Sequence, residues 1–73
     1  MGSLHSTDPT DLADIIEQWG KALTVDDLAG VIAVSIKQIY SLVKRGSLPH
    51  YRIASSIRFD PYKTAAWLRS QNA

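Results

Sequence analysis

The stretch that decides the fold runs from Leu23 to Gly46 and reads LTVDDLAGVIAVSIKQIYSLVKRG. It contains two helix start signals. Thr24 and Asp27 have the spacing of a capping box, in which each side chain satisfies a backbone N–H at the start of a helix. Ser35 can cap a second helix, which would run over residues 36–45 and end where Gly46 adopts a left-handed conformation.

Only Ala33 and Val34 lie between the two predicted helices. Helices this short cannot lie antiparallel across such a link, so we expect them to cross steeply in helix-turn-helix geometry. Ile39 and Leu42 would then face the core. The outer face of the second helix carries donors suited to base edges and phosphates. The residues predicted to contact DNA from this helix are Ser35, Lys37, Gln38, Tyr40, Ser41, Lys44 and Arg45. An ordinary solvated pair of amphipathic helices is the alternative.

A β-hairpin is predicted after Gly46, where the hydrophobic period changes to two. Apolar and basic residues alternate in Tyr51-Arg52-Ile53 and in Ile57-Arg58-Phe59, on either side of Ala54, Ser55 and Ser56. We therefore expect a hairpin with one apolar and one basic face, from which Arg52 and Arg58 point away from the apolar side. The residues predicted to contact DNA from this hairpin are Arg52, Ser55, Ser56 and Arg58.

One further helix is predicted at each end of the chain. Residues 8–20 place Leu12, Ile15, Ile16 and Trp19 at helical spacing, opposite an acidic face. This apolar stripe would cover the domain's own core or, alternatively, dock a second protomer or a recombinase. Asp60 followed by Pro61 opens the last helix, which directs Trp67 and Leu68 inward.

Length and composition allow one small domain over residues 8–73, preceded by a disordered segment 1–7. The chain has no cysteine and two isolated histidines, so we expect no disulfide, metal site or cofactor. We find no catalytic constellation and expect that the protein is not an enzyme. No run is long enough to span a membrane and no signal peptide is recognisable, so a cytoplasmic protein without membrane contacts is expected.

Charge is divided unevenly along the chain. Residues 1–31 contain six acids and one lysine, whereas residues 32–73 contain seven bases and one acid. We expect a positive field around the second helix and the hairpin, which a polyanion would meet first. The alternative is an ordinary mixed surface, because short chains show such asymmetry by chance.

The order TVDDLA, VSIKQIYSLVKRGSLP, YRI, IRFD and AAWL resembles the winged helix-turn-helix domains of excisionases and of the related AlpA-like and MerR-type regulators. The resemblance covers residues 23–70. It implies a mostly α fold with a small β-hairpin: an added N-terminal helix, a helix-turn-helix, a two-stranded wing and a C-terminal helix. This chain departs from the family pattern at two places. It has Ala33 where the family usually has glycine. It has Ala54, Ser55 and Ser56 where the family usually has glycine followed by basic residues.

The resemblance also implies sequence-specific binding of double-stranded DNA. Lys37, Gln38 and Ser41 would read bases, while the other predicted contacts would position the protein on phosphates. The expected role is that of an excisionase, a recombination directionality factor of a mobile element that bends DNA for a tyrosine or serine integrase. Its copies would associate head to tail on nucleoid DNA. An AlpA- or MerR-like transcriptional regulator is one alternative. A protein-interaction module with a degenerate winged helix is an alternative of another class.

Overall fold

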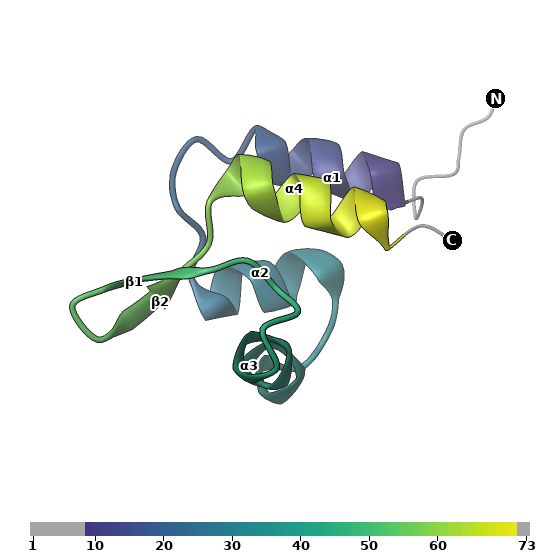
Figure 1. The fold of residues 1–73 in the computed structure, drawn as a ribbon. Coiled ribbons are helices and arrows are strands. Elements are labelled where there is room, and N and C mark those ends of the chain that lie inside the picture. Colours follow the sequence, from purple (N-terminus) through teal and green to yellow (C-terminus); the bar gives the residue numbers. More distant parts are fainter. Residues whose placement is uncertain (1–8, 72–73) are drawn as a thin grey trace, which may run out of the picture.

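The computed structural model describes residues 9–71, which form four helices and a two-stranded antiparallel sheet (Figure 1). In chain order the elements are α1 (Pro9–Glu17), α2 (Val25–Ile32), α3 (Ile36–Lys44), β1 (Tyr51–Ile53), β2 (Ser56–Arg58) and α4 (Pro61–Ser70). Figure 1 shows α1 and α4 side by side above α2, with α3 below and the hairpin projecting to one side. The segment 1–7, predicted to be disordered, lies outside the described residues.

Helix α1 packs along α4 and closes the core from above. Ala13 and Ile16 of α1 are fully buried. At the outer edge of the contact, the Arg69 guanidinium of α4 binds Asp14 at 2.8 Å and Glu17 at 3.2 Å. The apolar stripe of α1 therefore covers the chain's own core, which was the first of the two uses left open by the sequence.

The prediction for this helix was wrong in two details. The helix ends at Glu17 rather than near Gly20. Ile15, predicted to face inward, is 52% exposed, while Ala13 is buried in the core instead. Because α1 packs mainly on one neighbour, its buried strip is narrow. A residue about 100° from Ile16 around the helix axis therefore points away from α4.

Both predicted caps of the central helix pair are confirmed. Thr24 and Asp27 exchange two side chain–backbone hydrogen bonds of 3.0 Å at the start of α2. The Ser35 hydroxyl accepts a hydrogen bond from the Gln38 N–H at 3.1 Å and caps α3. Ala33 ends α2 in the left-handed region, with φ 58° and ψ 46°. This tight turn lets α3 cross α2 steeply, so that α3 is seen nearly end-on in Figure 1.

The hairpin has a different register from the predicted one. Its turn consists of Ala54 and Ser55 alone, because Ser56 already pairs with Ile53. The other partners across the strands are Tyr51 with Arg58 and Arg52 with Ile57. Residues directly opposite each other project from the same face, so the two arginines lie on opposite faces and the predicted basic face is wrong. The prediction placed three residues in the turn, and a shift of one residue moves every side chain of a strand to the other face.

A short backbone pairing ties the hairpin to the core. Leu23, just before α2, and Phe59, just after β2, exchange two backbone hydrogen bonds of 2.9 Å, and both side chains are fully buried. The Asp60 carboxylate then accepts a hydrogen bond from the Lys63 N–H at 2.8 Å and caps α4, as predicted. The base of the hairpin is thus fixed between α2 and α4, while its tip extends outward.

Candidate nucleic-acid interface

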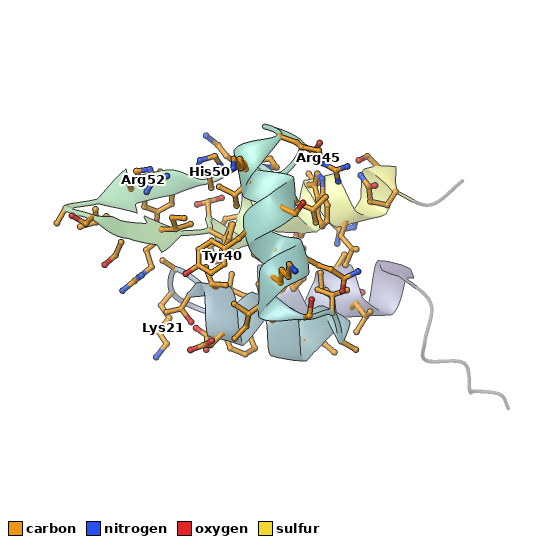
Figure 2. The ribbon with its side chains drawn as sticks, turned by 90° about the horizontal axis from the view of Figure 1, so that it is seen from below. Lys21, Tyr40, Arg45, His50 and Arg52 are labelled. Atoms are coloured by element: carbon orange, nitrogen blue, oxygen red, sulfur yellow. The ribbon has the colours of Figure 1, made fainter. Side chains whose placement is uncertain are left out.

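The outer face of α3 is solvent-exposed along its whole length. Ile39 and Val43 are buried in the core and Leu42 packs against it, while the helical period leaves the polar positions outside. All seven residues predicted to contact DNA from this helix are exposed: Ser35, Lys37, Gln38, Tyr40, Ser41, Lys44 and Arg45. Figure 2, seen from below, shows α3 in front of the other elements. This face therefore presents cations, hydroxyls and an amide on a rigid helix.

Gln38 also takes part in the N-cap of α3, a role that was not predicted from the sequence. Its side-chain oxygen accepts a hydrogen bond from the Ser35 backbone N–H at 3.0 Å, which completes a capping box at the start of α3. The Ser35 hydroxyl also lies 3.3 Å from the same oxygen. Only the amide NH₂ of Gln38 then remains for a ligand. Bidentate contact with adenine needs both amide atoms, so it would require opening of this cap.

A groove runs between α3 and the first strand of the hairpin, and we call it the α3–β1 groove. It is lined by Tyr40, Val43, Lys44, His50, Arg52 and Ile57. Figure 2 shows Tyr40, His50 and Arg52 on the hairpin side of α3, whereas Arg45 lies at the far side of the helix end. The structure therefore brings Tyr40 and Lys44 together with Arg52, while Arg45 extends the basic surface in the other direction.

A second groove lies between the start of α2 and the hairpin, and we call it the α2–β2 groove. Its lining comprises Thr24, Val25, Asp26, Tyr40, Arg52, Ser55, Ser56, Ile57 and Arg58. The four residues predicted to contact DNA from the hairpin all contribute to it. The Asp26 carboxylate gives this groove a negative charge that the α3–β1 groove lacks among its lining residues.

The two arginines of the hairpin differ in their freedom. Arg52 is exposed, and its side chain has no hydrogen-bond or ion-pair partner within residues 9–71. Arg58 is half-buried, and its guanidinium donates a hydrogen bond of 2.8 Å to the Ile57 carbonyl. Arg52 is therefore available to an incoming anion, whereas Arg58 would exchange an existing hydrogen bond.

His50 lies beside the predicted contact residues, although no role was predicted for it from the sequence. Its side chain is exposed and lines the α3–β1 groove with Lys44 and Arg52. The segment after Pro49 is extended, and alternate residues of an extended chain share a face. The spacing of His50 and Arg52 was thus a signal that these two side chains point to the same side.

The charge division along the sequence does not form two separate faces. Hydrogen bonds to Glu17 and Asp14 raise the pKa of Arg69 and occupy its charge on the α1–α4 side of the molecule. Asp26, from the acidic half of the sequence, lies beside the hairpin arginines in the α2–β2 groove. Apart from Arg69 and from Lys63 at the start of α4, the cations of the basic half lie on or next to α3 and the hairpin: Lys37, Lys44, Arg45, Arg52 and Arg58.

The described part of the chain contains neither a cluster of metal ligands nor a helix that could span a membrane. Among the side chains that the structure describes, no three from His, Cys, Asp or Glu come together to hold a metal ion. Over the same range, every helix is too short or too polar to cross a bilayer.

Comparison with known proteins gives one partial match. The uncharacterized protein YvgK of Bacillus subtilis (strain 168) is 40% identical over 37 residues, which are 51% of this chain and 12% of YvgK. The chain thus spans a small part of that relative. No protein-family model matches the chain. No solved structure matches it significantly.

Proposed function

We propose that this chain is a winged helix-turn-helix protein that binds double-stranded DNA. In this proposal α3 enters the major groove, and the β1–β2 hairpin lies over the neighbouring phosphate backbone as a wing. The observation that carries the proposal is the exposed polar face of α3, which lies beside the α3–β1 groove and its cations. A helix of this width fits the major groove of B-DNA.

The proposed contacts divide into base reading and phosphate binding. Lys37, Ser41 and the amide NH₂ of Gln38 face outward from the first two turns of α3, where they would meet base edges. Phosphate contacts come from Tyr40, Lys44, Arg45, Arg52 and Arg58, with the hydroxyls of Ser35, Ser55 and Ser56 as neutral donors. These phosphate contacts would supply affinity and register but no sequence information.

The family resemblance suggests a biological context for this binding. It favours an excisionase that bends DNA for a tyrosine or serine integrase, and its alternative is a transcriptional regulator of the AlpA or MerR type. Selection of bound duplexes from a random library would yield the preferred site. Sites repeated in tandem beside an integrase gene would favour excision, whereas a site that overlaps a promoter would favour regulation.

The experiment that tests DNA binding compares two lysine variants of equal charge. Binding of a labelled mixed-sequence duplex of about 20 base pairs, two helical turns, is measured by fluorescence anisotropy at low salt. Lys44→Ala removes a cation from the α3–β1 groove, while Lys21→Ala removes one from the loop between α1 and α2. We expect weaker binding for Lys44→Ala and unchanged binding for Lys21→Ala. Absence of binding, or equal losses for both variants, would contradict the proposal.

A protein-interaction module remains the second candidate, because several apolar side chains near the proposed interface are exposed. Ile36 is 46% exposed at the start of α3, and Ile53 is 58% exposed next to the hairpin turn. In the DNA model these side chains would contact thymine methyl groups or sugars. Under the interaction model Ile53→Ser would abolish partner binding, and the chain would show no salt-dependent affinity for duplex DNA.

A further inference from the structure

Three nitrogen-bearing side chains from separate parts of the chain converge on the α3–β1 groove. Lys44 comes from the last turn of α3, His50 from the segment before the hairpin and Arg52 from β1. All three are exposed, and Tyr40, which carries a hydroxyl, belongs to the same lining. This combination of two fixed cations, a hydroxyl and an imidazole suits a single phosphodiester group, because charge-assisted hydrogen bonds to phosphate are the strong ones.

The hydrogen bond of His50 determines which ring nitrogen remains for a ligand. Nδ1 lies 3.0 Å from the Leu48 carbonyl oxygen, which can only accept, so Nδ1 carries the hydrogen. The neutral ring then has an unprotonated Nε2. An unprotonated nitrogen is an acceptor and cannot donate to a phosphate oxygen, which also only accepts. Protonation at Nε2 converts this position into a charged donor without breaking the hydrogen bond to Leu48.

We propose that the α3–β1 groove binds one phosphodiester of DNA through Lys44, His50 and Arg52, and that His50 takes up a proton when it does so. This inference rests on the proposed function, since the phosphodiester belongs to the DNA backbone. It adds a site residue and a proton linkage to that function.

The charged and titratable groups around His50 come from three elements. They are Tyr40 and Lys44 from α3, Tyr51 and Arg52 from β1, and Asp60 and Lys63 from the start of α4. Three of these groups are cations and one is an anion, so the surroundings of His50 carry a net positive charge that favours an anionic ligand. A phosphodiester brings a negative charge into the groove and makes the proton favourable. Affinity should therefore rise as pH falls.

The test measures the dissociation constant for a labelled mixed-sequence duplex between about pH 7.5 and pH 5.5 at fixed ionic strength. Wild type should bind roughly three- to tenfold more tightly at the lower pH. His50→Gln keeps a neutral donor near the position of Nε2 but cannot titrate, so its affinity should be independent of pH. The matched control is His5→Gln, which removes the only other histidine and should retain the wild-type dependence. A parallel NMR titration of the His50 ring with and without duplex reports the proton directly.

The possible outcomes separate this inference from the function on which it rests. A flat profile for His50→Gln, with wild type and His5→Gln both gaining affinity at low pH, supports the proton-linked site. Duplex binding with the same pH dependence in His50→Gln and wild type overturns the inference and leaves the proposed function intact. Failure of wild type to bind any duplex at either pH overturns the proposed function together with the inference.

Discussion

Arg52 and Arg58 lie on opposite faces of the β1–β2 hairpin, because Arg52 pairs with Ile57 and Arg58 pairs with Tyr51. Arg52 and its partner Ile57 project from the same face of the hairpin, and both line the α3–β1 groove. Arg58 is half-buried and already bonded to a backbone carbonyl. The two arginines look equivalent in the sequence, yet they should contribute unequally to binding of an anion.

The first prediction concerns these two arginines. Arg52→Ala should weaken duplex binding by about 1 kcal/mol and reduce the slope of log K against log salt by about one, because it removes a free cation from the interface. Arg58→Ala should reduce the slope by less than half as much, since its guanidinium is engaged with the Ile57 carbonyl. Anisotropy titrations at several salt concentrations measure both slopes.

The control for these variants is Arg69→Met, which loses the same charge from α4. Arg69 is paired with Asp14 and Glu17 on the α1–α4 side, so its removal should leave the salt slope unchanged. A loss in Arg69→Met equal to that in Arg52→Ala would mean that net charge, rather than this surface, governs binding.

The second prediction separates the two tasks of Gln38. Gln38→Ala removes the acceptor for the Ser35 N–H and should lower the free energy of unfolding by about 0.5–1 kcal/mol. Gln38→Glu keeps that acceptor and adds a negative charge where the helix dipole favours it, so stability should be equal or higher. The same variant should lose DNA binding, because the carboxylate cannot donate and repels phosphate.

Thermal unfolding and anisotropy on the same samples measure these two effects. A shift of about 4–8 °C per kcal/mol makes the stability change measurable in a domain of this size. If Gln38→Glu bound DNA as tightly as wild type, then Gln38 would lie outside the interface.

The third prediction concerns Thr64, which is fully buried in α4. No hydrogen-bond partner for its hydroxyl is found among residues 9–71. Thr64→Val removes this unpaired hydroxyl at nearly constant shape and should stabilise the protein by roughly 1 kcal/mol. Thr64→Ser keeps the hydroxyl but loses a buried methyl group, so it should destabilise by about the same amount. Destabilisation by Thr64→Val would show that the hydroxyl bonds to a buried water.

The fourth prediction concerns the turn between α2 and α3. Ala33 occupies the left-handed region, where a Cβ atom costs roughly 1–2 kcal/mol. Ala33→Gly should raise the free energy of unfolding by about 0.5–1 kcal/mol, after the larger chain entropy of glycine is subtracted. Ala66→Gly, at an exposed helical position of α4, should instead lower it by about 1 kcal/mol. A loss of stability in both variants would mean that the turn relaxes around Ala33 without strain.

Sequence-local signals predicted the elements well. Thr24, Ser35 and Asp60 were identified as N-caps because a cap depends on residues three apart in the chain, and all three make the expected bonds. The left-handed conformation of Gly46 after α3 follows from the same kind of local rule. The exposure of the polar face of α3 could also be read from its helical period.

Features set by distant contacts could not be predicted in the same way. The faces of the hairpin depend on whether its turn has two or three residues, and the run Ala54-Ser55-Ser56 fits either length. The sequence does not show that Arg69 pairs with Asp14, which lies 55 residues earlier in the chain. The sequence also does not show that His50 lines a groove with Lys44 and Arg52, because this depends on how β1 lies relative to α3. Register and tertiary packing, rather than propensity, decide these points.

The measurement that tests the central claim most directly is the salt dependence of duplex binding by the wild-type chain. Five cations lie on α3 and the hairpin, namely Lys37, Lys44, Arg45, Arg52 and Arg58. If Lys44, Arg45 and Arg52 neutralise phosphates and Arg58 contributes in part, the slope of log K against log salt should be about −3 to −3.5. Such a slope would agree with a DNA-binding surface built from α3 and the hairpin. A flat salt dependence, or no binding of duplex DNA at low salt, would contradict it.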